Sequence, residues 1–216
     1  MLEQKLKELR ESINGYYLHI HSMLENVFKA IIDMDTAQLE KIIKSDERLA
    51  NEKELEIDEE CIDFIALYSP RGKALRIALM ILKMNNDFER IADHLVNIAE
   101  CGLRLSKRPG YSLPPKILDM YEGTNLMLKD AFKSFLDEDA YLAKDVLKRD
   151  DIIDNLHSES VKDLIKADVK QGNETLIDTF IISSNLERIA DLATNIAEDV
   201  IYIVEGKSYK HGHYTE

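Results

Sequence analysis

Residues 87–100 read DFERIADHLVNIAE, and residues 185–198 read NLERIADLATNIAE. Between 89–100 and 187–198 nine of twelve positions are identical, which is too close a match for chance and indicates an internal duplication. In each copy the apolar residues recur at intervals of three and four, the spacing that places one buried stripe along an α-helix. The repeated string therefore predicts two equivalent, deeply packed helices, one in each half of an all-α protein.

Helical periodicity continues over almost the whole chain and predicts six long helices. Their expected bounds are 2–33, 36–67, 73–106, 116–136, 139–169 and, after a turn at 171–173, a sixth helix that ends at 205. After the third helix, the segment KRPGYSLPPK at 107–116 holds three of the four prolines and is the expected linker. The order helix-helix-helix, linker, helix-helix-helix predicts two tandem, similar three-helix bundles of antiparallel helices.

The duplication also sets the expected domain bounds. We place a first three-helix repeat at 1–108, a second at 116–206 and a frayed tail at 207–216. The helix before each repeated string pairs with its counterpart, Asp63–Ile65 with Asp163–Ile165, at a separation of 100 residues. The repeated strings are 98 residues apart, and we assign the difference to the intervening turn, where a change of length costs little.

The chain is acidic, with 28 basic and 41 acidic residues and a net charge of −13. Such a charge repels nucleic acid and anionic lipid, and the basic patches at 107–108 and 207–210 are short, so neither partner is expected. No apolar run approaches the roughly 18–20 residues of a membrane span, and the charged first residues do not resemble a signal peptide. We therefore expect a soluble, cytoplasmic protein without membrane insertion.

Each copy of the repeated string carries a Glu and an Asp four residues apart, Glu89 and Asp93 in the first and Glu187 and Asp191 in the second. At this spacing the two carboxylates lie on one helix face and repel each other unless water, a basic residue or a cation compensates them. The simpler interpretation is a solvated acidic face whose arginines pair locally. Because both copies keep the pair, we favour a metal site with hard oxygen ligands.

The preceding helix in each half has an acidic gap in its apolar stripe. Between Ile43 and Ile57 the core-side positions are Asp46, Glu47, Ala50, Asn51 and Glu54. Between Leu147 and Val161 they are Asp150, Asp151, Asp154 and His157. A buried acidic gap is costly without compensating charge, and facing helices in bundles supply metal-binding carboxylates, so we expect one acidic pocket in each half. Two alternatives stay open: both gaps face solvent, and His157 is a surface or partly buried histidine rather than a ligand.

Together these motifs resemble the PhoU family, cytoplasmic regulators associated with bacterial phosphate uptake. The resemblance rests on IDEECIDFIALYSP at 57–70, on Leu75-Arg76 and on the two ERIAD strings. It implies multinuclear iron or zinc clusters on the bundle surface, held by pairs of acids four residues apart. The pairs map onto Glu47 and Asn51, Glu89 and Asp93, Asp150 and Asp154, and Glu187 and Asp191. Asn51 stands in place of an acid, and Glu54 or Asp46 is expected to supply the missing charge.

The resemblance also implies a function. A PhoU-like protein damps phosphate-starvation signalling and restrains phosphate import, through contact with the nucleotide-binding subunit of the phosphate ABC transporter and with the phosphate-sensing histidine kinase. A homodimer is expected. No enzymatic activity is expected, because the chain has no glycine-rich phosphate loop and no H-E-x-x-H motif. The alternatives are a carboxylate-bridged di-iron oxidase or store, and a metal-free helical adaptor.

Overall fold

The computed structural model describes the chain except residues 109, 168–172, 208, 211–212 and 215–216. The described elements are α1 (Leu2–Asp33), α2 (Thr36–Lys41), the π-helical segment η1 (Ile42–Asp46), α3 (Glu47–Tyr68), α4 (Lys73–Leu105), α5 (Pro115–Asp137), α6 (Ala140–Ala167), α7 (Asn173–Glu205), β1 (Tyr209–Lys210) and β2 (His213–Tyr214). Because α2, η1 and α3 follow one another without interruption, they correspond to the second predicted helix. The prediction of an all-α fold built from two tandem three-helix bundles is confirmed.

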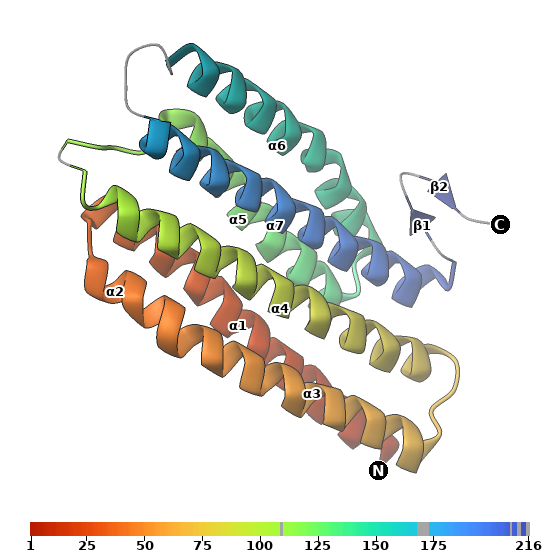
Figure 1. Ribbon diagram of the computed structural model, residues 1–216. Coiled ribbons are helices and arrows are strands. Elements are labelled where there is room, and N and C mark those ends of the chain that lie inside the picture. The colour runs from red at the N-terminus through yellow and green to blue at the C-terminus, as the bar shows by residue number, and fades with distance from the viewer. Residues whose placement is uncertain (109, 168–172, 208, 211–212, 215–216) are drawn as a thin grey trace.

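The helices form two layers (Figure 1). In one layer α3, α4, α7 and α6 lie side by side in that order, and neighbours in this order contact each other. Behind them α1 packs on α3 and α4, while α5 packs on α6 and α7. The two repeats therefore meet chiefly along α4 and α7, the helices that carry the repeated string. In the described part of the chain, no helix combines the length and the apolar composition needed to cross a membrane.

One continuous hydrophobic core runs through both repeats. Tyr16 and Phe28 of α1 and Phe132 of α5 are among its largest fully buried side chains. The ring of Phe132 stacks on that of Tyr17 with centroids 4.0 Å apart, and it also lies 5.8 Å from the ring of Phe88. Aromatic pairs of this kind add to the stabilisation that burial alone provides. The two bundles are thus packed on each other through a shared core.

The second helix of each repeat begins with the same local signals. Met34 and Glu138 end the preceding helices in the left-handed conformation, with φ of 55° and 52°. The next residue, Asp35 or Asp139, accepts hydrogen bonds from backbone N–H groups of the following first turn. An aspartate at this position satisfies amide groups that the helix itself leaves unpaired. The duplication therefore extends to the helix caps, at a separation of 104 residues.

The structure corrects the predicted offset in sequence between equivalent residues of the middle helices, α3 and α6. The buried Ala50 and Ile57 of α3 match the buried Ile153 and Ser160 of α6, a separation of 103 residues. The predicted value of 100 is wrong, because it pairs these two core residues with side chains of α6 that are only partly buried. The caps lie 104 residues apart, and the one-residue difference falls at η1, since a π-turn adds a residue to a helix.

Of the tail expected to be frayed at 207–216, residues 208, 211–212 and 215–216 lie outside the described residues, and the others include a short hairpin. β1 and β2 pair in antiparallel fashion, Tyr209 opposite Tyr214 and Lys210 opposite His213, and β1 contacts α7. Strands of two residues are too short to show the alternating apolar pattern by which a strand is predicted. This short hairpin is therefore an addition to the helical fold that residue patterns do not reveal.

Gly102 marks a close approach between α4 and its neighbours. A Cβ at this position would lie 2.7 Å from Cγ1 of Ile31 and 3.2 Å from Cδ1 of Leu39. We expect Gly102→Val to lower the free energy of unfolding by about 1–3 kcal/mol, because added carbons in a tight core force neighbours to shift. Denaturant unfolding followed by circular dichroism measures the change.

Gly15 of α1 provides the matched control for Gly102. A Cβ at Gly15 meets nothing within 4 Å. Because alanine favours the helix over glycine, Gly15→Ala should raise stability by about 0.5–1 kcal/mol. Equal effects at the two positions would contradict the close approach at Gly102.

Candidate metal centre

The acids of the second repeat gather between α6 and α7. Asp150 and Asp154 come from α6, and Glu187 and Asp191 come from α7. Burial, and after it the charges of Asp154 and Asp191, raise the pKa of Asp150 to about 6. Burial and the charges of Glu187 and Asp154 also raise the pKa of Asp191. The structure thus brings the four predicted residues into one second-repeat cluster of mutually repelling carboxylates.

The second-repeat cluster is short of compensating charge. The Oδ1 atom of Asp150 is buried and has no hydrogen-bond partner. Arg188 offsets only part of the shift at Asp191, whose pKa stays raised. Among the residues that the structure describes, none of the four carboxylates forms an ion pair within 4.0 Å. Asp154 and Asp191 are exposed while Asp150 and Glu187 are half-buried, so the cluster is partly open to solvent.

A first-repeat cluster forms between α3 and α4. Burial, then the charge of Asp93, then that of Glu54 raise the pKa of Glu89. Burial and the charge of Asp58 raise the pKa of Glu54. Two further predicted residues, Glu54 and Asp93, are therefore each close enough to repel Glu89. Sequence reasoning missed Asp58 because it follows Ile57, the residue taken as the end of the acidic gap.

Glu47 and Asn51 are less firmly connected to the first-repeat cluster. Glu47 is half-buried and Asn51 is exposed, and within the described chain neither forms a hydrogen bond or ion pair with Glu89 or Asp93. Asp46 forms an ion pair with Lys41 instead, with Oδ1 2.6 Å from Nζ. Glu54 is therefore the better source of the charge that Asn51 lacks. The ligand roles of Glu47 and Asn51 stay predictions.

The donor chemistry of the clusters suits a hard or borderline cation. Carboxylate oxygens are the ligands such cations accept, and the unpartnered Oδ1 of Asp150 is one of them. As the side chains lie, however, no group of three or more His, Cys, Asp or Glu in the described residues is placed to hold a metal ion. Carboxylates without a cation repel one another and stay apart. Binding therefore requires side-chain rotation that draws the carboxylates together.

The interface between the repeats includes Asn97 and Asn195, the asparagines that directly precede IAE in the two copies of the repeated string. Nδ2 of Asn97 donates to Oδ1 of Asn185 at 3.4 Å, and the same oxygen lies 2.8 Å from Nδ1 of His94. The equivalent Asn195 hydrogen-bonds Asp87 and holds its pKa down, although burial raises that pKa to about 6 overall. The conserved stripe within the duplication thus serves two purposes, with acids in the clusters and asparagines between α4 and α7.

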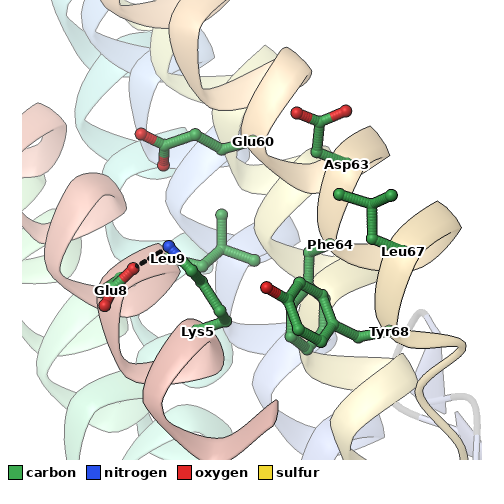
Figure 2. Close-up of a pocket in the computed structure, with 8 residues that line it drawn as sticks. All are labelled: Lys5, Glu8, Leu9, Glu60, Asp63, Phe64, Leu67 and Tyr68. Atoms are coloured by element: carbon green, nitrogen blue, oxygen red, sulfur yellow. Dashed lines mark hydrogen bonds and ion pairs between the residues drawn. The ribbon is translucent and has the colours of Figure 1, made fainter. Parts of the chain in front are cut away.

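Three surface hollows lie apart from the two clusters. Figure 2 shows a hollow of about 290 Å³ between α1 and the end of α3, where Phe64 and Tyr68 stack near the ion pair of Lys5 and Glu8. A second hollow, of about 420 Å³, is lined by residues within 137–144 and by 204–205. A third, of about 490 Å³, lies at the other end of the second repeat and is lined by residues within 104–108 and 174–178. Neither cluster contributes a residue to these three hollows. The clusters are therefore separate surface features.

The fold and the two clusters define a duplicated helical-bundle protein with an acidic cluster in each half. The PhoU domain family matches residues 13–102 and 117–200, one domain in each repeat, and the chain belongs to this family. It is 33% identical over 212 residues to phosphate-specific transport system accessory protein PhoU homolog 1 of Thermotoga maritima, covering 96% of this chain and 90% of that protein. The PhoU homolog of Aquifex aeolicus is 31% identical over 218 residues, covering 100% and 98%.

Solved structures share the whole arrangement of helices. The phosphate transport system regulatory protein PhoU from Streptococcus pneumoniae superposes with a TM-score of 0.91 at 24% identity, covering 97% of this chain and 100% of that chain. PhoU from Pseudomonas aeruginosa superposes with a TM-score of 0.89 at 25% identity, covering 95% and 100%. The likeness spans both repeats, so it includes the placement of one bundle against the other. The predicted family resemblance is confirmed.

Proposed function

We propose that this protein is an accessory regulator of a phosphate-specific transport system. The observation that carries the proposal is the similarity to proteins named for that role, which extends over 96% and 100% of this chain for the relatives from T. maritima and A. aeolicus. The surface of α3 adds support, because the apolar side chains of Leu55, Ile62 and Leu67 are 60–73% exposed. Exposed apolar side chains of this kind are available for contact with protein partners.

The partners we propose are the nucleotide-binding subunit of the phosphate ABC transporter and the phosphate-sensing histidine kinase. The protein acts in the cytoplasm as a homodimer, and through these contacts it restrains phosphate import and damps the starvation signal. It works by contact and catalyses no reaction. Its net charge of −13 favours basic surfaces on the partners, because opposite charges speed association and suppress wrong pairings.

We also propose that each acidic cluster binds a cation, iron or zinc. The proposed ligands are Asp150, Asp154, Glu187 and Asp191 in the second repeat and Glu54, Glu89 and Asp93 in the first, with Glu47 and Asn51 as further ligands there. A bound cation compensates the burial and the mutual repulsion that raise the pKa of Asp150 and Glu89, and it joins the two helices that carry each cluster. It thereby gives the face that carries the cluster a defined shape for docking.

We expect the protein to bind the purified nucleotide-binding subunit of the phosphate transporter from the same organism, as measured by size-exclusion chromatography and isothermal titration calorimetry. The control is the nucleotide-binding subunit of an unrelated ABC transporter, which should not bind. In cells, deletion of the gene should switch on a phosphate-starvation reporter at high phosphate, and this chain should restore repression. Normal reporter levels in the deletion strain, together with no binding to the subunit, would contradict the proposal.

A further inference from the structure

We infer that the hollow between α1 and the end of α3 receives an arginine side chain of a partner protein, the nucleotide-binding subunit of the phosphate transporter. The inference rests on the proposed function and deepens it, because it assigns the contact to one surface of the first repeat and names the side chain that this surface accepts. We call this surface the α1–α3 hollow (Figure 2).

One face of α3 and one face of α1 form the α1–α3 hollow. On α3 the lining residues recur at intervals of three and four, the spacing of a single helix face: Glu60, Asp63, Phe64, Leu67 and Tyr68. On α1 they follow the same spacing: Lys5, Glu8 and Leu9. The volume of about 290 Å³ is several times the space that one water molecule takes in the liquid, so a long side chain fits.

The end of α3 gives the α1–α3 hollow an aromatic wall. The rings of Phe64 and Tyr68 stack with centroids 5.8 Å apart, and Figure 2 shows them lying against each other. Leu67 beside them is exposed and widens the apolar surface. At the 103-residue offset of the middle helices the second repeat has Ala167 in place of Phe64, so the wall is particular to the first repeat.

The charges of the α1–α3 hollow are unbalanced, since three acids and one base line it. The base, Lys5, forms an ion pair with Glu8, with Nζ 2.6 Å from Oε2. Its hydrogen bond to Glu8 is the first cause of the raised pKa of Lys5, and the charge of Glu60 is the last. Within the described chain Glu60 and Asp63 form no ion pair within 4.0 Å. These two carboxylates therefore lack a cation.

The second repeat places a cation at the equivalent position. Glu60 corresponds to Asp163 of α6 at the 103-residue offset, and Ser12 of α1 corresponds to Lys116 of α5 at the 104-residue offset of the helix caps. Nζ of Lys116 lies 2.8 Å from Oδ2 of Asp163. Ser12 carries no charge, so the first repeat keeps the acid without the cation that accompanies it in the second. A partner can supply that cation.

Arginine is the cation that fits both features of the α1–α3 hollow. Its planar guanidinium stacks on aromatic rings and donates paired hydrogen bonds to a carboxylate, whereas the ammonium of lysine acts as a point charge. Arginine is also enriched among the few residues that carry most of the binding energy of an interface. An arginine of the partner would thus lie against Phe64 and Tyr68 and pair with Glu60 and Asp63.

Isothermal titration calorimetry of the full-length protein with the purified nucleotide-binding subunit tests the inference. Glu60→Gln with Asp63→Asn removes both unpaired charges while keeping the side-chain shape, and it should weaken binding by at least about 10-fold. The matched control is Glu56→Gln with Glu59→Gln, which removes the same charge from exposed positions of α3 outside the hollow and should change the affinity by no more than about twofold. Circular dichroism verifies that each variant folds.

Ser12→Lys tests the comparison between the repeats. The new lysine should pair with Glu60 from α1, as Lys116 pairs with Asp163 from α5, and so compete with the arginine of the partner. Binding of the subunit should weaken in Ser12→Lys and stay unchanged in Ser12→Gln, which adds a long side chain without a charge.

Alanine replacement of each surface arginine of the subunit identifies the partner residue. One arginine should matter for binding to the wild type and matter little for binding to the Glu60→Gln, Asp63→Asn protein, which is the mark of a direct contact in a double-mutant cycle. Equal affinity of the wild type, this double variant and Ser12→Lys would overturn the inference, as would an equal loss in the Glu56 and Glu59 control, while the proposed regulator would stand. Failure of the wild type to bind the subunit would refute both.

Discussion

Phe132→Ala is expected to lower the free energy of unfolding by about 3–5 kcal/mol, because it removes a fully buried aromatic side chain and leaves a cavity. The ring is 0% exposed and lies between Tyr17 of α1, Phe88 of α4 and Phe135 of its own helix, with centroids 4.0, 5.8 and 5.6 Å away. Its contacts thus come from both repeats. Urea unfolding followed by circular dichroism measures the loss, and one cooperative transition is expected because the core is continuous.

Leu126 provides a control for Phe132 on the same helix. Its side chain is 48% exposed, so Leu126→Ala should change stability by no more than about 0.5 kcal/mol. A cost below about 1 kcal/mol for Phe132→Ala would contradict the shared core, since a buried phenylalanine cannot be removed so cheaply from close packing. Two separate unfolding transitions would likewise indicate that each repeat has a core of its own.

Replacing Glu187 by Gln together with Asp191 by Asn is expected to remove about half of the bound metal and to leave the fold intact. The two substitutions keep the side-chain shape while removing the charge of two ligands, and only one of the two clusters is affected. Metal content of untagged protein, measured by inductively coupled plasma mass spectrometry, gives the result. The metal-free variant should be at least as stable as the metal-free wild type. The two substitutions remove the charges of Glu187 and Asp191, which repel the carboxylate of Asp150 and contribute to its raised pKa.

The matched control for this double substitution is Glu59→Gln with Asp63→Asn. These acids are also four residues apart and exposed on α3, but they belong to neither cluster, so metal content should not change. Removal of residues 211–216 should also leave metal content unchanged, because the tail histidines are not among the proposed ligands. Unchanged metal in the double variant of Glu187 and Asp191 would show that the second-repeat assignment is wrong.

Two further measurements separate the alternative functions. Protein purified without a tag from metal-supplemented cells should contain iron or zinc, whereas a metal-free adaptor would contain neither. Iron-loaded protein should consume no more oxygen than free iron under the same conditions. Rapid oxygen consumption would favour the carboxylate-bridged oxidase over the regulator, because that reaction requires a di-iron centre.

The candidate site was predictable from the sequence where its members lie on one helix. Glu187 and Asp191 share a face because they are four residues apart, and the duplication indicated that the pair matters. Contacts between helices were not predictable in the same way. Asp58 contributes to the first cluster, and Nδ1 of His157 lies 2.7 Å from Oγ of Ser183, only because α3 turns one particular face to α4 and α6 turns one to α7. The π-turn at η1 adds one residue to the second helix of the first repeat and so changes which face of α3 meets α4. The periodicity of apolar residues does not reveal this extra residue.

Residue patterns alone determined the duplication, the order of the six long helices and the apolar stripe of each, because helix periodicity and caps are local properties of the chain. Only the tertiary structure decided what each stripe packs against. It placed α4 against α7, made one core of two repeats and placed the asparagines of the repeated string at the interface between the bundles. The physical reason is that a periodic apolar stripe specifies which face of a helix leaves water, whereas its neighbour on that face depends on the shapes and polar groups of all the other helices.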